Sequence, residues 1–222
     1  MLYEVSSCFI SLKLKVDATM SFVKPAATLP TQLYALIAFG ANLPFEGLSP
    51  EDTIKAALRR FHEENMAPLS CSGFYRTSCF PIGAGPDYIN GCLKINISQK
   101  TEAASVLESL HEIEAEFGRE REQRWGMRTL DLDLLAIEDH VLPDLNGYLA
   151  WQNLDLDGQK SVAPREIILP HPRLHDRAFV LVPLADIAPN WCHPVRRLTV
   201  QQMLDALPQA EVKQVLVGKI PN

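Results

Sequence analysis

The chain has 222 residues, 47% hydrophobic and 22% charged, which is an ordinary balance for a globular protein with a sizeable core. Its formal net charge of −6 argues against general binding to nucleic acid or to anionic membranes, because both need a basic surface. No run of about 18 apolar residues occurs, so the sequence predicts no membrane span.

The cysteines indicate the redox compartment. There are five, without any C-x-x-C pair: Cys8, Cys71, Cys79, Cys92 and Cys192. An odd number without metal-ligand spacing favours neither a disulfide framework nor a zinc ribbon. We therefore expect a cytoplasmic protein.

Residues 1–30 carry no clear targeting pattern. The segment CFISLKLKV is only weakly amphipathic and is interrupted by Lys13 and Lys15, whereas a signal peptide needs a basic start and an unbroken apolar stretch. A transit peptide is rich in arginine, and this segment has none. Met20 offers a second possible start. We predict that residues 1–30 are a disordered extension and that residues 31–222 form a single domain.

Strand and helix signals alternate from residue 33 onward. Residues 33–40, LYALIAFG, are an apolar run of strand length that ends in a Gly-Ala-Asn turn signal. Ser49 followed by Pro50 predicts a helix start, and apolar residues at helical spacing extend that helix to about residue 65. Residues 69–77, LSCSGFYRT, predict the next strand.

The following segments complete one motif. Residues 78–87 are rich in Pro and Gly and predict a loop before the alternating strand 88–98. Thr101 is predicted to cap a second helix, and Gly118 to end it in the left-handed conformation before a last strand. The order strand-helix-strand-strand-helix-strand predicts an α+β, ferredoxin-like core with an antiparallel sheet and two helices on one face.

A less regular carboxyl-terminal extension follows. Residues 139–165 are polar and predict a long loop or insertion. Residues 167–169 predict a short strand, and 177–181 a short helix. Residues 199–207 predict another helix, and 211–217 a last strand or tail.

The stretch 118–137, GREREQRWGMRTLDLDLLAI, carries the strongest chemical signal. Because side chains alternate along a strand, Asp131 and Asp133 point the same way, about 6.5 Å apart. Such a pair suits Mg²⁺, which takes one or two carboxylates together with substrate phosphates. The arginines just before it bind phosphate bidentately. The stretch therefore predicts a site for metal-bound polyphosphate, with a half-solvated edge strand as the alternative.

Four segments share the order and spacing of a known family. They are FGANL at 39–43, FYRTSCFP…PDYINGCL at 74–93, GREREQRWGMRTLDLDLL at 118–135 and LPHPRLHDRAFVLVPLADIAP at 169–189. Together they resemble the 6-hydroxymethyl-7,8-dihydropterin pyrophosphokinase family over about residues 33–195. The chain departs from the family pattern at Met127, where proline is frequent, and in a longer insertion at 144–165.

The resemblance implies a reaction in folate biosynthesis. Pyrophosphate moves from ATP to the hydroxymethyl oxygen of the pterin, leaving AMP. Two Mg²⁺ ions would be held by Asp131 and Asp133. Arg119 and Arg128 would be catalytic and would offset the charge that develops between the α and β phosphates.

The resemblance also divides the remaining residues between the two substrates. Arg121 and Trp125 belong to a loop that closes over ATP in the family, and His171 and Arg177 match nucleotide-phosphate contacts. The implied pterin-binding residues are Thr77, Phe80, Tyr88, Asn90 and Phe179. Two aromatic faces can hold a flat heterocycle, and Asn90 and Thr77 can read its polar edge.

Two other classes of function remain open. A palm-type nucleotidyl cyclase or polymerase also combines this fold with paired carboxylates, although it places them on the first strand and the central hairpin. A non-catalytic ferredoxin-like module is the second alternative, and the acidic charge opposes RNA binding. We expect a monomeric, stand-alone enzyme whose partners are two small molecules.

Overall fold

The computed structural model describes residues 33–64, 66–79, 83, 85–119, 128–154 and 166–220. These residues belong to the unit that runs from Gln32 to Asn222. The prediction for residues 1–30 lies outside the described residues. No described helix is long and apolar enough to cross a membrane.

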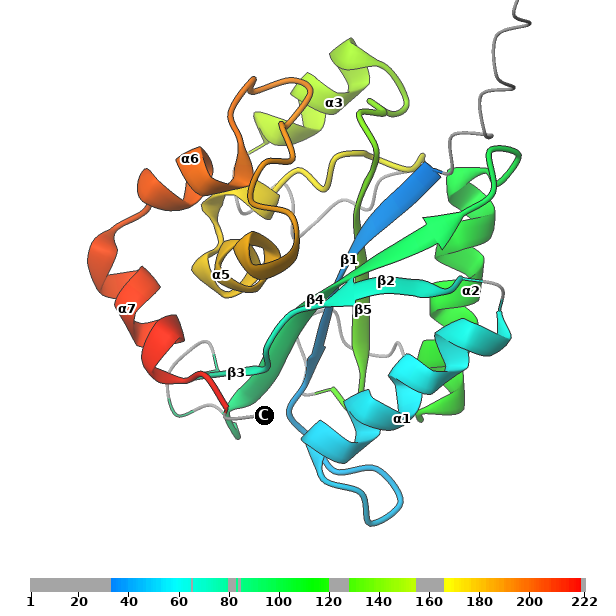
Figure 1. The fold of residues 1–222 in the computed structure, drawn as a ribbon, viewed down its shortest axis with the longest axis vertical. Coiled ribbons are helices and arrows are strands. Elements are labelled where there is room, and N and C mark those ends of the chain that lie inside the picture. The colour runs from blue at the N-terminus through cyan, green and yellow to red at the C-terminus, as the bar shows by residue number, and fades with distance from the viewer. Residues whose placement is uncertain are drawn as a thin grey trace, which may run out of the picture. The chain divides into compact units, whose positions relative to one another are not determined.

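The centre of the fold is an antiparallel sheet. Its strands are β1 (Leu33–Ala41), β2 (Pro68–Cys71), β3 (Tyr75–Thr77), β4 (Tyr88–Ile97) and β5 (Asp131–Ile137). The strand order is β2-β4-β1-β5, and β3 also pairs with β4 (Figure 1). The predicted strand at 69–77 is thus two short strands on the same partner, separated by Ser72–Phe74.

Two helices cover one face of the sheet, as predicted. They are α1 (Pro50–Glu63) and α2 (Ala103–Glu116), which lie together on one side in Figure 1. Ser49 caps α1, because its hydroxyl accepts a hydrogen bond from the Asp52 N–H at 3.2 Å. The predicted cap Thr101 is wrong: Glu102 is the N-cap of α2, and the Thr101 N–H instead closes a turn to the Ser98 carbonyl.

Gly118 ends this helix region as expected. Its φ of 75° lies in the left-handed region that favours glycine, and a Cβ there would lie 2.4 Å from the Phe45 ring. Between α1, α2 and the sheet lies the main core, which contains Leu130, Leu132 and Leu134 of the Asp-Leu-Asp region. The predicted alternation of this strand is confirmed.

The carboxyl-terminal extension covers the other face. It contains the short 3-10 helix η1 (Leu174–Asp176), α5 (Ala178–Ile187), α6 (Val200–Asp205) and α7 (Gln209–Val217). α5 and α6 lie on the side of the sheet opposite α1 and α2 in Figure 1. A second core forms between this layer and the sheet, with Leu36, Cys92 and Leu135 from the strands. Because both faces are covered, the central strands are apolar on both sides.

Three predictions for this extension need correction. Within the predicted loop 139–165, residues Leu145–Gln152 form the helix α3, whose cap Asp144 accepts from the Gly147 N–H at 2.8 Å. The segment 211–217, predicted as a last strand or tail, is the helix α7, since its buried residues Val212 and Val215 are three apart. The predicted strand at 167–169 is reduced to an isolated bridge between Leu142 and Leu169.

Candidate active site

The paired carboxylates sit in a row of facing residues across three strands. Gly40 of β1 lies opposite Asn90 of β4 on one side and opposite Asp131 of β5 on the other. Two residues back, Ala38 lies opposite Asp133. Residues that face each other on neighbouring strands point to the same side of the sheet. Ala38 also faces Cys92 of β4, and Cys92 belongs to the core between the sheet and α5. Both carboxylates therefore lie on the α5 side, away from α1 and α2.

Two of the predicted arginines contact the first carboxylate. The Arg119 guanidinium lies 2.8 Å from Asp131 Oδ1, and the Arg128 guanidinium is ion-paired with the same oxygen. Burial and the nearby Asp133 raise the pKa of Asp131, while the two arginines oppose that shift. Arginine and carboxylate groups thus gather at one end of β5, as the sequence predicted.

Asn42, which the sequence marked only as a turn signal, holds Arg128 in place. Its side chain is 2% exposed, and Oδ1 accepts from the Arg128 N–H at 2.8 Å. Its Nδ2 donates to the Pro86 carbonyl at 3.1 Å, so one amide joins the end of β1 to two loops beside the site. Nothing in the local pattern distinguishes this asparagine from an ordinary turn residue.

Glu114 of α2 was also missed, although a signal existed. It follows Leu110 by four residues and therefore lies on the buried stripe of the helix. It is 1% exposed, and its Oε1 accepts from the Leu132 N–H at 2.7 Å. The same oxygen is ion-paired with Arg119. A carboxylate on an apolar helix face thus fixes both the strand and the arginine next to Asp131.

The predicted phosphate contacts His171 and Arg177 come to the same place. The His171 N–H donates to the Leu135 carbonyl of β5 at 2.8 Å, and the ring Nδ1 accepts from the Arg173 N–H at 3.1 Å. Burial, followed by the charge of Arg177, lowers the pKa of His171 to about 3. The neutral ring therefore carries its proton on Nε2. Burial also lowers the pKa of Arg177, whereas Asp133 raises it.

The predicted pterin residues occupy the adjoining strands. Asn90 is 8% exposed, and its Nδ2 donates to Thr77 Oγ1 at 2.7 Å. A Cβ on Gly40 would lie 2.9 Å from Asn90 Oδ1, so only glycine leaves that amide in place. Burial raises the pKa of Tyr88, which also feels Arg128 and Asp131.

Phe179, at the start of α5, is an exposed large apolar side chain. It is 40% exposed, and the Arg177 guanidinium lies 5.7 Å from its ring centroid. An aromatic face left open beside a polar site is suited to stacking on a flat ring. The predicted residues Phe80, Arg121 and Trp125 lie outside the described residues.

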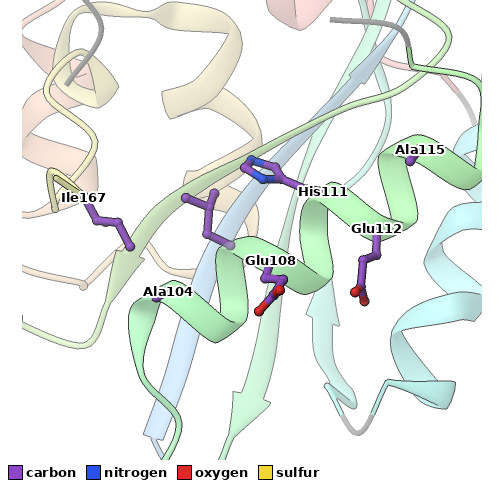
Figure 2. A pocket seen from close by; sticks show the side chains of 7 residues that line it. Ala104, Glu108, His111, Glu112, Ala115 and Ile167 are labelled. Carbon is purple, nitrogen blue, oxygen red and sulfur yellow. The ribbon is translucent and has the colours of Figure 1, made fainter. Parts of the chain in front are cut away.

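A separate hollow of about 500 Å³ lies along the outer side of α2. Figure 2 shows its side chains, which come from α2 and from Ile167. They are Ala104, Leu107, Glu108, His111, Glu112, Ala115 and Ile167. None of them is a predicted site residue, so this hollow does not mark the chemistry.

The fold and the site are those of an α+β protein of ferredoxin-like plan in which paired carboxylates and arginines meet at one end of β5. Comparison with protein families gives the family. The family model described as 7,8-dihydro-6-hydroxymethylpterin-pyrophosphokinase (HPPK) matches residues 36–189. The chain belongs to this family.

Curated relatives agree with this assignment. The chain is 35% identical over 148 residues to a Synechocystis 2-amino-4-hydroxy-6-hydroxymethyldihydropteridine pyrophosphokinase, a match that covers 67% of this chain and 64% of the relative. It is 33% identical over 163 residues to the Haemophilus influenzae protein of the same name, covering 72% of this chain and 84% of the relative.

A Plasmodium falciparum HPPK-DHPS crystal structure with SDX-DHP matches with a TM-score of 0.53 at 13% identity. That match covers 81% of this chain and 46% of the other. At this identity the likeness supports the fold alone. The chain spans less than half of that longer protein and 64%, less than two thirds, of the Synechocystis relative.

Proposed function

We propose that this chain transfers pyrophosphate from ATP to the hydroxymethyl group of 6-hydroxymethyl-7,8-dihydropterin, giving AMP and the pterin diphosphate. The observation that carries the proposal is the meeting of Asp131 and Asp133 with Arg119 and Arg128 at one end of the sheet. In the reaction, the hydroxymethyl oxygen bonds to the β-phosphorus. The bond from that phosphorus to the oxygen bridging to the α-phosphate breaks, and AMP leaves.

The donor set fits two Mg²⁺ ions. Asp131 and Asp133 offer hard oxygen ligands on one face of β5, and Ala38 beside Asp133 takes little space. When bound at Asp131 and Asp133, the ions would supply positive charge that neutralises the phosphates.

The chain's own cations act on the phosphates. Arg119 and Arg128 already contact Asp131, so they need little movement to reach a phosphate held there. Fixed guanidinium groups offset charge that develops between the α and β phosphates without reorganising at the moment of reaction. His171, neutral with its proton on Nε2, donates to a phosphate oxygen, and Arg177 adds a further charge. Arg121 and Trp125 complete the ATP side.

The pterin lies against β3, β4 and the start of α5. Asn90 and Thr77, joined by a 2.7 Å hydrogen bond, present a fixed polar edge to the ring. Tyr88 and Phe179 supply aromatic faces, and the exposed ring of Phe179 is accessible for stacking on the pterin ring. Phe80 completes this side.

The two other classes fit less well. Palm-type enzymes place carboxylates on the first strand, whereas β1, LYALIAFGA, contains none. A non-catalytic module does not account for two arginines that are ion-paired with one carboxylate of a pair on the same strand face.

An assay for AMP tests the proposal. The purified chain is incubated with ATP, Mg²⁺ and 6-hydroxymethyl-7,8-dihydropterin, and AMP and pterin diphosphate are quantified. We expect equal amounts of both products, and none when the pterin or Mg²⁺ is omitted. The same assay is run on Asp131→Asn and Asp133→Asn. Asp205→Asn, at an exposed position on α6, is their matched control because it also removes one aspartate charge. ATP loss without pterin diphosphate would refute the proposal.

We further propose that residues 31–222 are a single domain and that the protein is a cytoplasmic monomer. Cys71, Cys92 and Cys192 are free thiols, which supports a reducing compartment. Light scattering on a size-exclusion column tests the monomer, and a fluorescent fusion tests the location. Removal of residues 1–30 should change neither Tm nor turnover, and a clear drop in either would show that the segment contributes to the domain.

A further inference from the structure

The carboxyl-terminal residues 218–220, here called the strap, lie along the edge strand β3. The Arg76 N–H donates to the Gly218 carbonyl at 2.7 Å, and the Ile220 N–H donates to the Phe74 carbonyl at 2.8 Å. An antiparallel bridge also joins Tyr75 to Lys219. The family model ends at residue 189, so the strap lies beyond the matched part of the chain.

β3 depends on the hydrogen bonds from the strap because β3 is so short. It has three residues, and its only strand partner in the described sheet is β4. Three ladder positions give few backbone hydrogen bonds with which to fix a strand at a sheet edge. The strap supplies hydrogen bonds to the edge of β3 that β4 does not use. The position of β3 is thus set from both sides.

A side-chain anchor strengthens the contact. The Tyr75 hydroxyl donates to Asp186 Oδ2 of α5 at 2.8 Å, and the Gly73 N–H donates to the same oxygen at 3.1 Å. Lys219 Nζ of the strap lies 3.5 Å from that oxygen. One carboxylate therefore holds the start of β3, the strap and the end of α5 together.

The approach of the strap to β3 tolerates no side chain at Gly218. A Cβ there would lie 1.9 Å from the Arg76 carbonyl oxygen and 3.0 Å from its carbon. The φ of Gly218 is −79°, an ordinary value, so the glycine is required by space and not by backbone conformation. α7, just before it, packs Val212 and Val215 against Tyr75 in a small core.

The strap is connected to both predicted pterin contacts. Thr77, whose Oγ1 accepts from Asn90, follows Arg76 directly, and Arg76 is the residue that the strap binds. The small core beneath α7 also includes Ala178, the residue before Phe179. The nucleotide-side residues, by contrast, come from β5, from the segment after α2 and from the residues on either side of η1. Among the described residues, no backbone hydrogen bond or bridge joins the strap to these segments.

We propose that the strap is a positioning element for the pterin half of the site: by fixing β3 it sets the Thr77–Asn90 pair, and α7 supports Phe179. The inference rests on the proposed function. It assigns a role in pterin affinity to residues 218–220, which lie beyond the part of the chain that the family model matches. It predicts a selective effect, because loosening β3 disturbs the pterin contacts and leaves the carboxylates and arginines of β5 unchanged.

Gly218→Ala tests the proposal directly. We expect the KM for the pterin to rise about tenfold, equivalent to about 1.4 kcal/mol, while the KM for ATP changes by less than about twofold. Amide hydrogen exchange should be faster at 75–77 and unchanged in β1. Val217→Ala, at a neighbouring residue that is 88% exposed, is the matched control and should behave as wild type.

A merely structural role gives a different result. Partial unfolding lowers kcat through the fraction of active enzyme and leaves both KM values unchanged, and that outcome would overturn the proposal. Because Gly218→Ala can fail to fold, Tyr75→Phe gives a second test: it removes only the hydroxyl that binds Asp186. It should raise the pterin KM alone, by less than Gly218→Ala, with Tyr34→Phe at the start of β1 as its control.

The two proposals fail separately. A wild-type chain that forms no AMP from ATP and the pterin would overturn the proposed function. An active wild type, combined with an unchanged pterin KM in both Gly218→Ala and Tyr75→Phe, would overturn the role of the strap alone.

Discussion

Replacement of Glu114 tests how α2 supports the active site. Its buried carboxylate accepts from the Leu132 N–H at 2.7 Å and is ion-paired with Arg119. Glu114→Ala removes this acceptor from a strand residue that is 3% exposed. Among the described residues, it also removes one of the two carboxylates that contact Arg119, the other being Asp131 at 2.8 Å.

The size of the effect follows from these contacts. A hydrogen bond to a charged group contributes about 1.5–3 kcal/mol, and removal of one partner from a buried ion pair costs about 3–5 kcal/mol. The Arg119 side chain is 16% exposed and keeps Asp131, so the ion-pair figure is an upper bound. We expect Glu114→Ala to lower the free energy of unfolding by about 3 kcal/mol. Glu114→Gln keeps an acceptor for Leu132 and should cost about 1 kcal/mol.

Urea unfolding followed by tryptophan fluorescence measures both variants. The slope of free energy against urea should stay constant, so that the midpoint alone reports the change. Glu112→Ala, at an exposed position on the same helix, should stay within about 0.5 kcal/mol of wild type. The reasoning is refuted if Glu114→Ala matches that control, or if Glu114→Gln costs as much as Glu114→Ala.

Three further predictions follow from the site and from one buried histidine. Asp131→Asn or Asp133→Asn should nearly abolish AMP formation while leaving the circular dichroism spectrum unchanged; near-wild-type turnover at saturating Mg²⁺ would contradict the metal assignment. Phe179→Ala should weaken pterin binding at least about tenfold, or about 1.4 kcal/mol, in calorimetry and spare a non-hydrolysable ATP analogue; the reverse pattern would show that the two half-sites are assigned wrongly. Burial lowers the pKa of His193 from 6.5 to about 4, so below pH 6.5 the unfolded chain binds a proton that the folded chain does not, and stability falls as pH falls from 6.5 to about 4. Relative to wild type, His193→Asn should flatten the dependence of Tm on pH in this window, and an unchanged slope would rule this histidine out as a cause.

Local patterns were sufficient where one segment carries the whole signal. Alternation alone put Asp131 and Asp133 on one face of a strand, and β5 confirms it. The Ser-Pro start of α1 and the left-handed Gly118 were likewise correct, because caps and glycine conformations depend on a few neighbouring residues. The βαββαβ order followed from the succession of such segments.

Predictions failed where packing decides between two local possibilities. The segment 211–217 has apolar residues that fit a short strand, but burial of Val212 and Val215 against Tyr75 selects a helix. Residues 145–152 contain a glycine and polar residues, yet a helix forms there because Tyr148 is fully buried and its hydroxyl meets His193 at 3.2 Å. Neither contact partner is near in sequence, so no local pattern contains the information.

The sequence by itself determined the acidic pair and its arginines, because they lie in one continuous segment, and it determined the fold plan through the succession of strand and helix signals. Only the tertiary structure decided which residues support them. Asn42 is 86 positions from Arg128 in the chain, and the strap at Gly218 is still farther from Arg76, yet each makes a backbone hydrogen bond of 2.7–2.9 Å. Such contacts depend on how the sheet brings distant segments to one edge. The periodicity of a single segment cannot predict that arrangement.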